Sequence, residues 1–579
     1  MKKVSLLTIS FLLVVIQGLY AQEEIQPVTK TFAIKDAYIV QKPGQILSVG
    51  TVVIKNGLIE SVGTNVSIPF NAKVLEADSM YVYAGFIDGL SHVGIPMPES
   101  KNNQGSRRNM REKDAANPSY EKAGIQPHLA VRDLLNPKDK SISDMRKLGF
   151  TAAHVVPRGK MLPGGGSLIL LNGQKADDFI FQDDLSIFAQ LQGAGGVYPA
   201  TTIAVMSKFR ELYHQAEQSK DHITAYKRNP AGMARPGQDR VLQAFHPVIN
   251  NSQKIFFAAP NVKDIHRVFT LQKELNFPLV LADVKQGWHL ADKIKSTRTP
   301  VLLSLSLPKD KSKKGAKKAA GKKKEGEAKI EGAAKKELAK EKGKKVSKEL
   351  TAFQKRQKES LKQHNAQAAT FQDKGITFGF TSINAKSSTI KANLQKMIKH
   401  GLKEETAIAA LTTVPAQQLG VSKMMGTIEK GKIANLVVSD KPYFDEKSNV
   451  RFVMVEGKVF EYEIKKKKPT SGDSDKPAKV AGTWNYSIDV AGTSTGGTLK
   501  LSNDGGNISG VITNDQADGP ADIEDVELDG NELTFAVPMD DTGNIKVTIT
   551  VTIEEDEMEG TVDIPGMGSA EMEGSRIPE

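Results

Sequence analysis

Near the start of the chain, apolar and polar residues alternate with the short period of β-strands. Residues 51–54 and 58–62 are rich in Val and Ile, and they flank Asn56 and Gly57. An Asn-Gly pair between two such segments favours a two-residue hairpin turn. Further short β patterns follow, so the sequence predicts a small β region over residues 31–83.

From residue 84 to residue 425, short apolar segments alternate with longer segments of helical periodicity. Buried strands that alternate with helices predict βα units around a parallel sheet. Without a Lys-rich insert, this region has roughly 300 residues, enough for an α/β fold of the (β/α)8 TIM-type barrel class. The predicted strands include residues 150–156, 254–258, 277–282, 300–305 and 376–380.

The last part of the chain has a third pattern. A polar linker is predicted over residues 464–480, and residues 481–579 alternate short apolar segments with Gly- and Asp-rich turns. About eight such strands predict a separate small all-β domain, either an antiparallel barrel or a sandwich. Two interpretations remain open for this domain: a ligand-binding or docking module, and an accessory domain that stabilises the protein.

The first 21 residues have the pattern of a secretory signal peptide. Lys2 and Lys3 precede an apolar segment over residues 6–16, and Ala21 offers a cleavage site. The alternative is an uncleaved anchor, but the apolar segment is shorter than the roughly 20 residues of a spanning helix. The sequence therefore predicts export to the periplasm or the extracellular space, with no membrane span after cleavage.

The absence of cysteine limits the chemistry that the chain can perform. Without Cys there is no disulfide, no thiolate metal ligand and no Cys nucleophile. A bound metal ion would have to use His and carboxylate ligands, and the chain has only ten His.

Charge is segregated along the chain, although the formal net charge is +12. Residues 309–350 hold 17 Lys and seven acidic residues, whereas residues 481–579 hold three basic and 21 acidic residues. This segregation indicates modules with different surfaces, and the net positive charge does not by itself indicate a nucleic-acid binder. Because export is also predicted, no nucleic-acid partner is expected. The Lys-rich insert is either a basic lid that attracts an anionic substrate or an acidic partner, or a solvated loop on the catalytic face of the barrel.

Two distant sets of motifs resemble the amidohydrolase superfamily. The first combines the hairpin region with Ala-Gly-Phe-Ile-Asp-Gly-Leu-Ser-His at residues 84–92. The second is Gly-Thr-Ile-Glu-Lys-Gly-Lys-Ile-Ala-Asn-Leu-Val-Val at residues 426–438. The pattern is most similar to the imidazolonepropionase-like branch. The resemblance implies that residues 31–83 and 426–463 form one composite β-sandwich beside a TIM-type barrel over residues 84–425.

This resemblance also implies a divalent metal ion, such as zinc, and hydrolysis of carbon–nitrogen (non-peptide) bonds. Family members hold the metal with a His-x-His pair on the first barrel strand, further His residues, and an Asp after the last strand. In this chain the pair is reduced to His92, and Ser382 takes the place of the Asp. The fifth strand offers Ala258 and the sixth offers Ala282 or Asp283. Most metal ligands are therefore missing.

Several residues remain candidates for a site. His92 is the remnant of the metal site. It could form a rearranged zinc site together with His154 and Asp283. The alternative is that His92 is only a hydrogen-bonded residue of the pocket. Asp283 and Ser382 are the catalytic candidates.

Ligand binding has a second set of candidates. His154 could face the pocket, and the run Gly164, Gly165 and Gly166 could bind an anion with its main chain or serve as a flexible connection.

Three hypotheses about function follow from these observations. The chain is a hydrolase with an altered metal site, a catalytically inactive relative that binds a small ligand or a protein partner at the barrel mouth, or a surface-interaction protein. In the third case, the Lys-rich insert and the acidic β-domain are the interacting parts, and their opposite charges allow them to attract each other at low salt.

Overall fold

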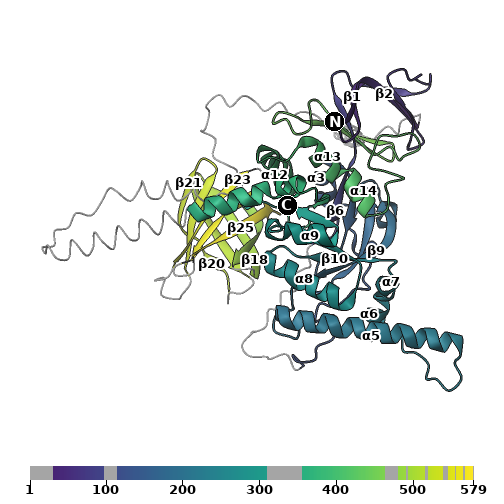
Figure 1. Ribbon diagram of the computed structural model, residues 1–579. Coiled ribbons are helices and arrows are strands. Elements are labelled where there is room, and N and C mark those ends of the chain that lie inside the picture. Colours follow the sequence, from purple (N-terminus) through teal and green to yellow (C-terminus); the bar gives the residue numbers. More distant parts are fainter. Residues whose placement is uncertain are drawn as a thin grey trace, which may run out of the picture. The chain divides into compact units, whose positions relative to one another are not determined.

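A computed structural model describes residues 30–96, 114–308, 355–462 and 480–577, the last range with gaps at 491–492, 515–518, 539–545, 555 and 565–567. The expected signal peptide, the Lys-rich insert 309–350 and the linker 464–480, except residue 480, lie outside the described residues. The described residues fall into two compact units, one before the linker and one after it (Figure 1).

The first unit contains an eight-stranded sheet built from both ends of its sequence. The order is β16-β15-β14-β5-β1-β2-β3, and β4 pairs with β1. β14 runs antiparallel to β5, with Val437 opposite Tyr83, so the segment after residue 426 joins the N-terminal segment in one sheet. The strands are β1 Thr31–Lys42, β2 Gln45–Lys55, β3 Leu58–Gly63, β4 Lys73–Glu76, β5 Tyr81–Ala84, β14 Leu436–Ser439, β15 Val450–Val455 and β16 Lys458–Glu461.

The predicted hairpin is confirmed. β2 and β3 are antiparallel and are joined through Asn56 and Gly57, which have φ values of 51° and 79°. Positive φ at both central residues is the conformation of the type I′ turn, whose twist matches that of the strands.

A second eight-stranded sheet is barrel-like and carries the candidate site. Its order is β13-β12-β11-β10-β9-β8-β7-β6, and the sheet curls until the last strand meets the first, where the Thr381 hydroxyl donates to the Leu90 carbonyl at 2.5 Å. The strands are β6 Phe86–Ser91, β7 Phe150–Val155, β8 Gly164–Leu170, β9 Ile180–Gln190, β10 Lys254–Ala258, β11 Leu279–Val284, β12 Val301–Ser304 and β13 Phe378–Thr381.

One strand of this sheet departs from the expected all-parallel (β/α)8 pattern. β8 runs antiparallel to both β7 and β9, whereas the other neighbours in the sheet are parallel. A parallel crossover needs about a dozen residues or more. The connections on both sides of β8 are shorter than that, so the chain must reverse direction. The prediction of a regular (β/α)8 barrel was wrong at this strand.

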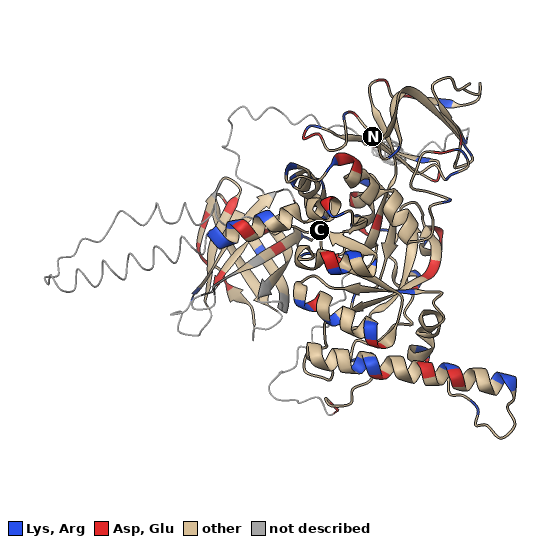
Figure 2. Cartoon of the chain, in the orientation of Figure 1, with Lys and Arg blue, Asp and Glu red and all other residues tan. Residues whose placement is uncertain are grey.

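Helices lie around the barrel-like sheet, and Figure 2 shows Lys, Arg, Asp and Glu along them. α8 is an example, since its buried residues Ile265, Val268, Leu271 and Leu275 recur at helical spacing. Among the described helices, none combines the length and the apolar composition of a membrane span. The helices are α2 Val131–Leu134, α3 Lys140–Lys147, α4 Ala176–Phe179, α5 Thr202–Arg228, α6 Arg240–Ala244, α7 His246–Ile249, α8 Val262–Leu275, the 3-10 helix η1 Trp288–Leu290, α9 Ala291–Thr297, residues 355–373, α12 Ser387–Lys399, α13 Glu404–Leu411 and α14 Thr413–Gln418.

The second unit is a nine-stranded antiparallel sheet in the order β20-β19-β18-β17-β25-β24-β23-β22-β21. Its buried side chains, among them Trp484, Phe535 and Met572, form a hydrophobic core of their own. The strands are β17 Gly482–Val490, β18 Thr493–Asp504, β19 Asn507–Asn514, β20 Ala521–Asp522, β21 Glu524–Asp529, β22 Glu532–Pro538, β23 Lys546–Glu554, β24 Glu557–Ile564 and β25 Gly568–Arg576.

Candidate functional site

The carboxyl ends of the barrel strands bring the candidate residues to one end of the sheet, which we call the barrel mouth. The sheet order makes β10 the fifth strand, β11 the sixth and β13 the eighth, as the sequence predicted. Seven of the eight strands run in the same direction, so the residues after β6, β11 and β13 share this end.

His154 is fully buried inside the barrel and uses both ring nitrogens. Nδ1 lies 3.0 Å from the Gly89 carbonyl oxygen and Nε2 lies 2.8 Å from the Ser186 hydroxyl oxygen. The ring also meets Phe256 edge to face at 4.5 Å between centroids. Burial lowers the pKa of His154 to about 4. The hydrogen bond to Gly89 raises the pKa, but its effect is the smaller of the two. His154 therefore packs and ties strands together, and it has no free nitrogen for a ligand.

The three glycines form the start of β8, in place of the flexible connection or anion cradle that the sequence suggested. Gly164, Gly165 and Gly166 lie opposite residues of β9 in an antiparallel ladder. A Cβ on Gly166 would lie 2.4 Å from both His154 Nε2 and Ser186 Oγ. Glycine is thus required at position 166 because the imidazole of His154 occupies the adjacent space.

His92 follows β6 and is half-buried at the barrel mouth. Its Nδ1 lies 2.8 Å from the Val156 carbonyl oxygen, and its ring meets the edge of Phe188 on β9 at 6.2 Å between centroids. Burial and the positive charge of Arg158 lower the pKa of His92 to about 4, although the hydrogen bond to Val156 raises it. The imidazole is therefore neutral at neutral pH.

Asp88 is a buried residue of the mouth that the sequence reasoning did not single out. Its carboxylate accepts a hydrogen bond from the Ser382 amide at 3.0 Å and another from the Ser382 hydroxyl. Burial raises the pKa of Asp88 to about 7, while the hydrogen bonds from Ser382 and Leu90 lower it. Ser382 is therefore occupied as a hydrogen-bond donor to Asp88. Asp88 stood inside the Gly-Phe-Ile-Asp motif at residues 85–88, which was the available signal.

Asp283, near the end of β11, has an unusual backbone and an unpartnered carboxylate oxygen. Its φ is 52°, a left-handed conformation at an irregular step of the ladder between β11 and β12. Oδ2 accepts a hydrogen bond from Asn384 at 2.8 Å and lies 3.6 Å from the Lys285 ammonium nitrogen. Oδ1 is buried, and within the described ranges it has no hydrogen-bond partner. Buried polar groups are nearly always hydrogen-bonded, so this oxygen marks a place for a donor.

The residues present do not fit the metal centre that the family resemblance implies. In the part of the chain that the structure describes, no three His, Asp or Glu side chains lie close enough to hold an ion. The rearranged site from His92, His154 and Asp283 is therefore not formed. Both nitrogens of His154 are occupied, and three protein ligands are the usual set for catalytic zinc.

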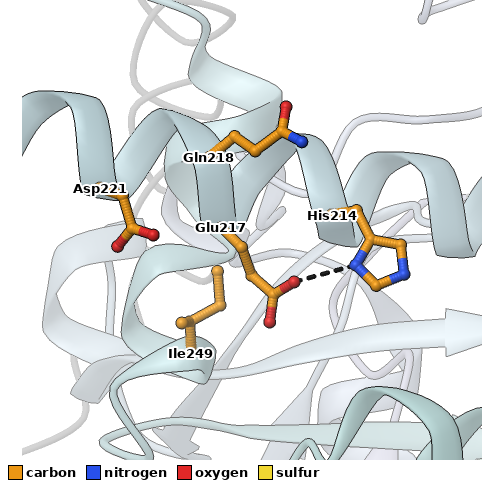
Figure 3. A pocket seen from close by; sticks show the side chains of 5 residues that line it. All are labelled: His214, Glu217, Gln218, Asp221 and Ile249. Carbon is orange, nitrogen blue, oxygen red and sulfur yellow. Dashed lines mark hydrogen bonds and ion pairs between the residues drawn. The ribbon is translucent and has the colours of Figure 1, made fainter.

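A surface pocket of about 460 Å³ lies on α5, away from the candidate residues of the mouth (Figure 3). Its lining includes Glu217, Asp221 and His214, and His214 Nδ1 pairs with Glu217 Oε2 at 2.9 Å. The side chain of His214 is 60% exposed. An exposed contact of this kind contributes little energy and does not define a site.

Comparison with known proteins confirms the resemblance to amidohydrolases. Residues 314–460 match the amidohydrolase family. A crystal structure of an amidohydrolase from Thermotoga maritima MSB8 is similar over 74% of this chain and 100% of its own, with 19% identity and a TM-score of 0.57. The chain thus has the mixed α/β fold of an amidohydrolase.

More distant structures have amidohydrolase or dipeptidase names. A Xaa-Pro dipeptidase with methionine bound in its active site is 15% identical over 75% of this chain and 100% of its own, with a TM-score of 0.40. A β-aspartyl dipeptidase from Fervidobacterium islandicum-AW-1 is 12% identical over 74% of this chain and 97% of its own, with a TM-score of 0.38. No protein with a curated description matches the sequence.

Proposed function

We propose that this protein uses an amidohydrolase fold to bind a small molecule at the barrel mouth, without the metal-dependent hydrolysis of the family. The observation that carries the proposal is the buried Oδ1 of Asp283, which has no hydrogen-bond partner among the described residues and belongs to a residue in the left-handed conformation. Strained residues with unsatisfied polar atoms concentrate at ligand-binding and active sites. A ligand that donates an N–H or O–H would supply the missing partner.

Side chains inside the barrel that could bind a metal ion are already engaged in hydrogen bonds, which supports the absence of metal chemistry. His154 is held by Gly89 and Ser186, and Ser382 is held by Asp88. The positions at the ends of the fifth and sixth strands offer the methyl groups of Ala258 and Ala282. A metal ion would therefore find His92 and Asp283 without a third ligand among these positions.

Elemental analysis of the purified full chain tests this point. The protein is prepared without chelator and without a His-tag, and is then soaked with zinc and desalted. We expect metal far below one ion per chain before and after the soak. About one zinc, iron or manganese ion per chain would overturn the proposal, because it requires an intact ligand set.

A screen of small polar compounds by thermal shift tests ligand binding. Compounds that bind the folded state raise its melting temperature, and the shift grows with the logarithm of the ligand concentration relative to the dissociation constant. We expect a set of hits whose shifts are lost in an Asp283→Gly variant. The absence of any hit that depends on Asp283 would contradict binding at the mouth.

The second candidate is a hydrolase of carbon–nitrogen (non-peptide) bonds with an altered site. The amidohydrolase match over residues 314–460 and the shared fold favour it. This candidate would be established instead if elemental analysis finds bound metal and if the protein turns over cyclic amides in a reaction that is lost on substitution of His92.

We also propose that the chain is exported and that residues 481–579 form a separate accessory domain. The charged start, apolar segment and Ala21 support export, and the core of its own in the nine-stranded sheet supports a separate domain. Mass spectrometry of the protein from its native cell should find Gln22 as the first residue. A chain that retains residue 1 would contradict cleavage.

A further inference from the structure

His92 and Arg158 at the barrel mouth each use one nitrogen in a hydrogen bond to the backbone, and their other nitrogens have no partner among the described residues. His92 follows β6, and its Nδ1 lies 2.8 Å from the carbonyl oxygen of Val156, after β7. Arg158 follows β7, and its Nε donates to the carbonyl oxygen of Ile95, after β6, at 3.0 Å. These reciprocal bonds join the two loops and hold both side chains in place before any ligand arrives.

The free side of Arg158 is the end of its guanidinium group, which forms no ion pair with a described residue. Its two terminal guanidinium nitrogens make no hydrogen bond and no ion pair with any described residue. Asp139 is near enough to influence Arg158, but its Oδ1 accepts hydrogen bonds from the amide and the hydroxyl of Ser141 at the start of α3. A half-buried guanidinium presents a planar pair of donors that matches a carboxylate.

The free side of His92 is a hydrogen-bond acceptor. A carbonyl oxygen carries no proton, so the bond to Val156 requires that Nδ1 donates. In the neutral ring the other nitrogen, Nε2, then has a lone pair, and no described side chain or backbone group donates to it. The contact between the ring and Phe188 on β9 places it toward the interior of the barrel mouth.

We propose that Arg158 and His92 together bind a small organic carboxylate that carries a hydroxyl or an N–H next to the carboxylate. The guanidinium takes the two carboxylate oxygens, and Nε2 of His92 accepts the neighbouring O–H or N–H. The inference deepens the proposed function, on which it rests, by giving the ligand a chemical class. Among the described residues of the mouth, the free guanidinium end of Arg158 carries one charge, which fits the single charge of a carboxylate better than a phosphate dianion.

Three related probes test this class with the full chain. Mandelate has the carboxylate and the hydroxyl, mandelamide lacks the charge, and phenylacetate lacks the hydroxyl. Binding is measured by calorimetry and thermal shift. We expect mandelate to bind more tightly than either of the others, and its affinity to fall as salt concentration rises.

Variants separate the two roles. Arg158→Gln should weaken mandelate binding roughly ten- to a hundredfold, as expected for the loss of a charged hydrogen bond. Arg158→Lys keeps the charge without the fork and should lie in between. His92→Phe should abolish the preference for mandelate over phenylacetate and keep the preference over mandelamide. Arg298→Gln removes the same charge at an exposed position after α9 and should change nothing.

The failures are distinguishable. Equal binding of mandelate and mandelamide, no binding of either, or unchanged mandelate binding in Arg158→Gln would overturn the inference. If uncharged compounds still bind in an Asp283-dependent way, the proposed function stands. If no compound binds at all, the proposed function fails as well. Melting temperatures without ligand show whether each variant is folded.

Discussion

The carboxylate of Asp88 accepts hydrogen bonds from both the backbone amide and the hydroxyl of Ser382, which lies 294 residues further along the chain. This pair joins the first strand of the barrel-like sheet to the end of the last, where Thr381 also donates to Leu90. Ser382 thus has a structural role here. Closure of the sheet involves the same residue that the family resemblance aligns with a metal-binding Asp.

The first prediction concerns the pH dependence of stability due to Asp88. Burial raises its pKa from 3.8 to about 7, so the folded state keeps this proton to a higher pH than the unfolded chain. Its stabilising contribution is complete below pH 3.8 and is lost as pH rises toward 7. Asp88→Asn imitates the protonated form, so its free energy of unfolding should rise relative to wild type by a few kcal/mol between about pH 4 and about pH 8.

Urea unfolding of both proteins across this pH range measures the difference. Ser382→Ala is the complementary variant, because removal of the hydroxyl, whose hydrogen bond lowers the pKa of Asp88, should raise that pKa further. A difference between wild type and Asp88→Asn that is independent of pH would show that Asp88 does not titrate in this way.

The second prediction concerns the glycine run of β8. Gly166→Ala places a Cβ 2.4 Å from His154 Nε2 and Ser186 Oγ, and such overpacking typically costs roughly 1–3 kcal/mol. Gly165→Ala is the matched control, because its Cβ would have no atom nearer than 3.6 Å and should cost less than about 1 kcal/mol. Melting temperatures decide the question. Equal effects of the two substitutions would contradict the packing role assigned to Gly166.

The sequence predicts those parts of the fold that depend on local pattern. The hairpin at Asn56 and Gly57 follows from turn chemistry, and the order of β10, β11 and β13 follows from apolar segments between helices. β8 was missed because Gly164 to Gly166 has the composition of a turn. Only the ladders with the neighbouring strands β7 and β9 make it a strand, and the local composition of the glycine run does not reveal that pairing.

The site could be predicted only as a set of positions. The family's ligand set indicated the strand ends at which to look, but it did not show that His154 is held by Ser186 or that Asp88 holds Ser382. These are contacts between strands, and no local pattern encodes them. The left-handed φ of Asp283 is equally invisible in the sequence, because it arises at an irregular step between two strands.

The third prediction concerns acid sensitivity due to His154. Burial lowers its pKa from 6.5 to about 4, so the contribution of the neutral ring is complete above pH 6.5 and is lost as pH falls toward 4. His154→Gln cannot titrate. It should be less stable than wild type by roughly 1–3 kcal/mol at neutral pH, because Gly89 and Ser186 lose good partners. Its stability should then fall less steeply on acidification.

Urea unfolding of His154→Gln from neutral pH down to about pH 4 measures this slope. His266→Gln, at an exposed position on α8, is the control for removal of an imidazole and should follow the wild-type profile. Parallel profiles for His154→Gln and wild type would mean that the ring titrates alike in the folded and unfolded chains.

The last prediction concerns Asp283 and compares the stability of its variants with their ability to bind small compounds. Two features of Asp283 cost free energy, each on the order of 1 kcal/mol or more: its left-handed φ and a buried oxygen that has no partner in the described part of the chain. Asp283→Gly removes both costs but loses the bond to Asn384, so its stability should stay within about 1 kcal/mol of wild type or exceed it. Asp283→Val keeps the strain with a β-branched side chain and should be clearly less stable.

If Asp283 is retained for a ligand, Asp283→Gly must lose the thermal shifts produced by small compounds while remaining folded. A drop in stability of several kcal/mol in the glycine variant would instead make Asp283 a structural residue, and intact ligand shifts in that variant would remove it from the binding site.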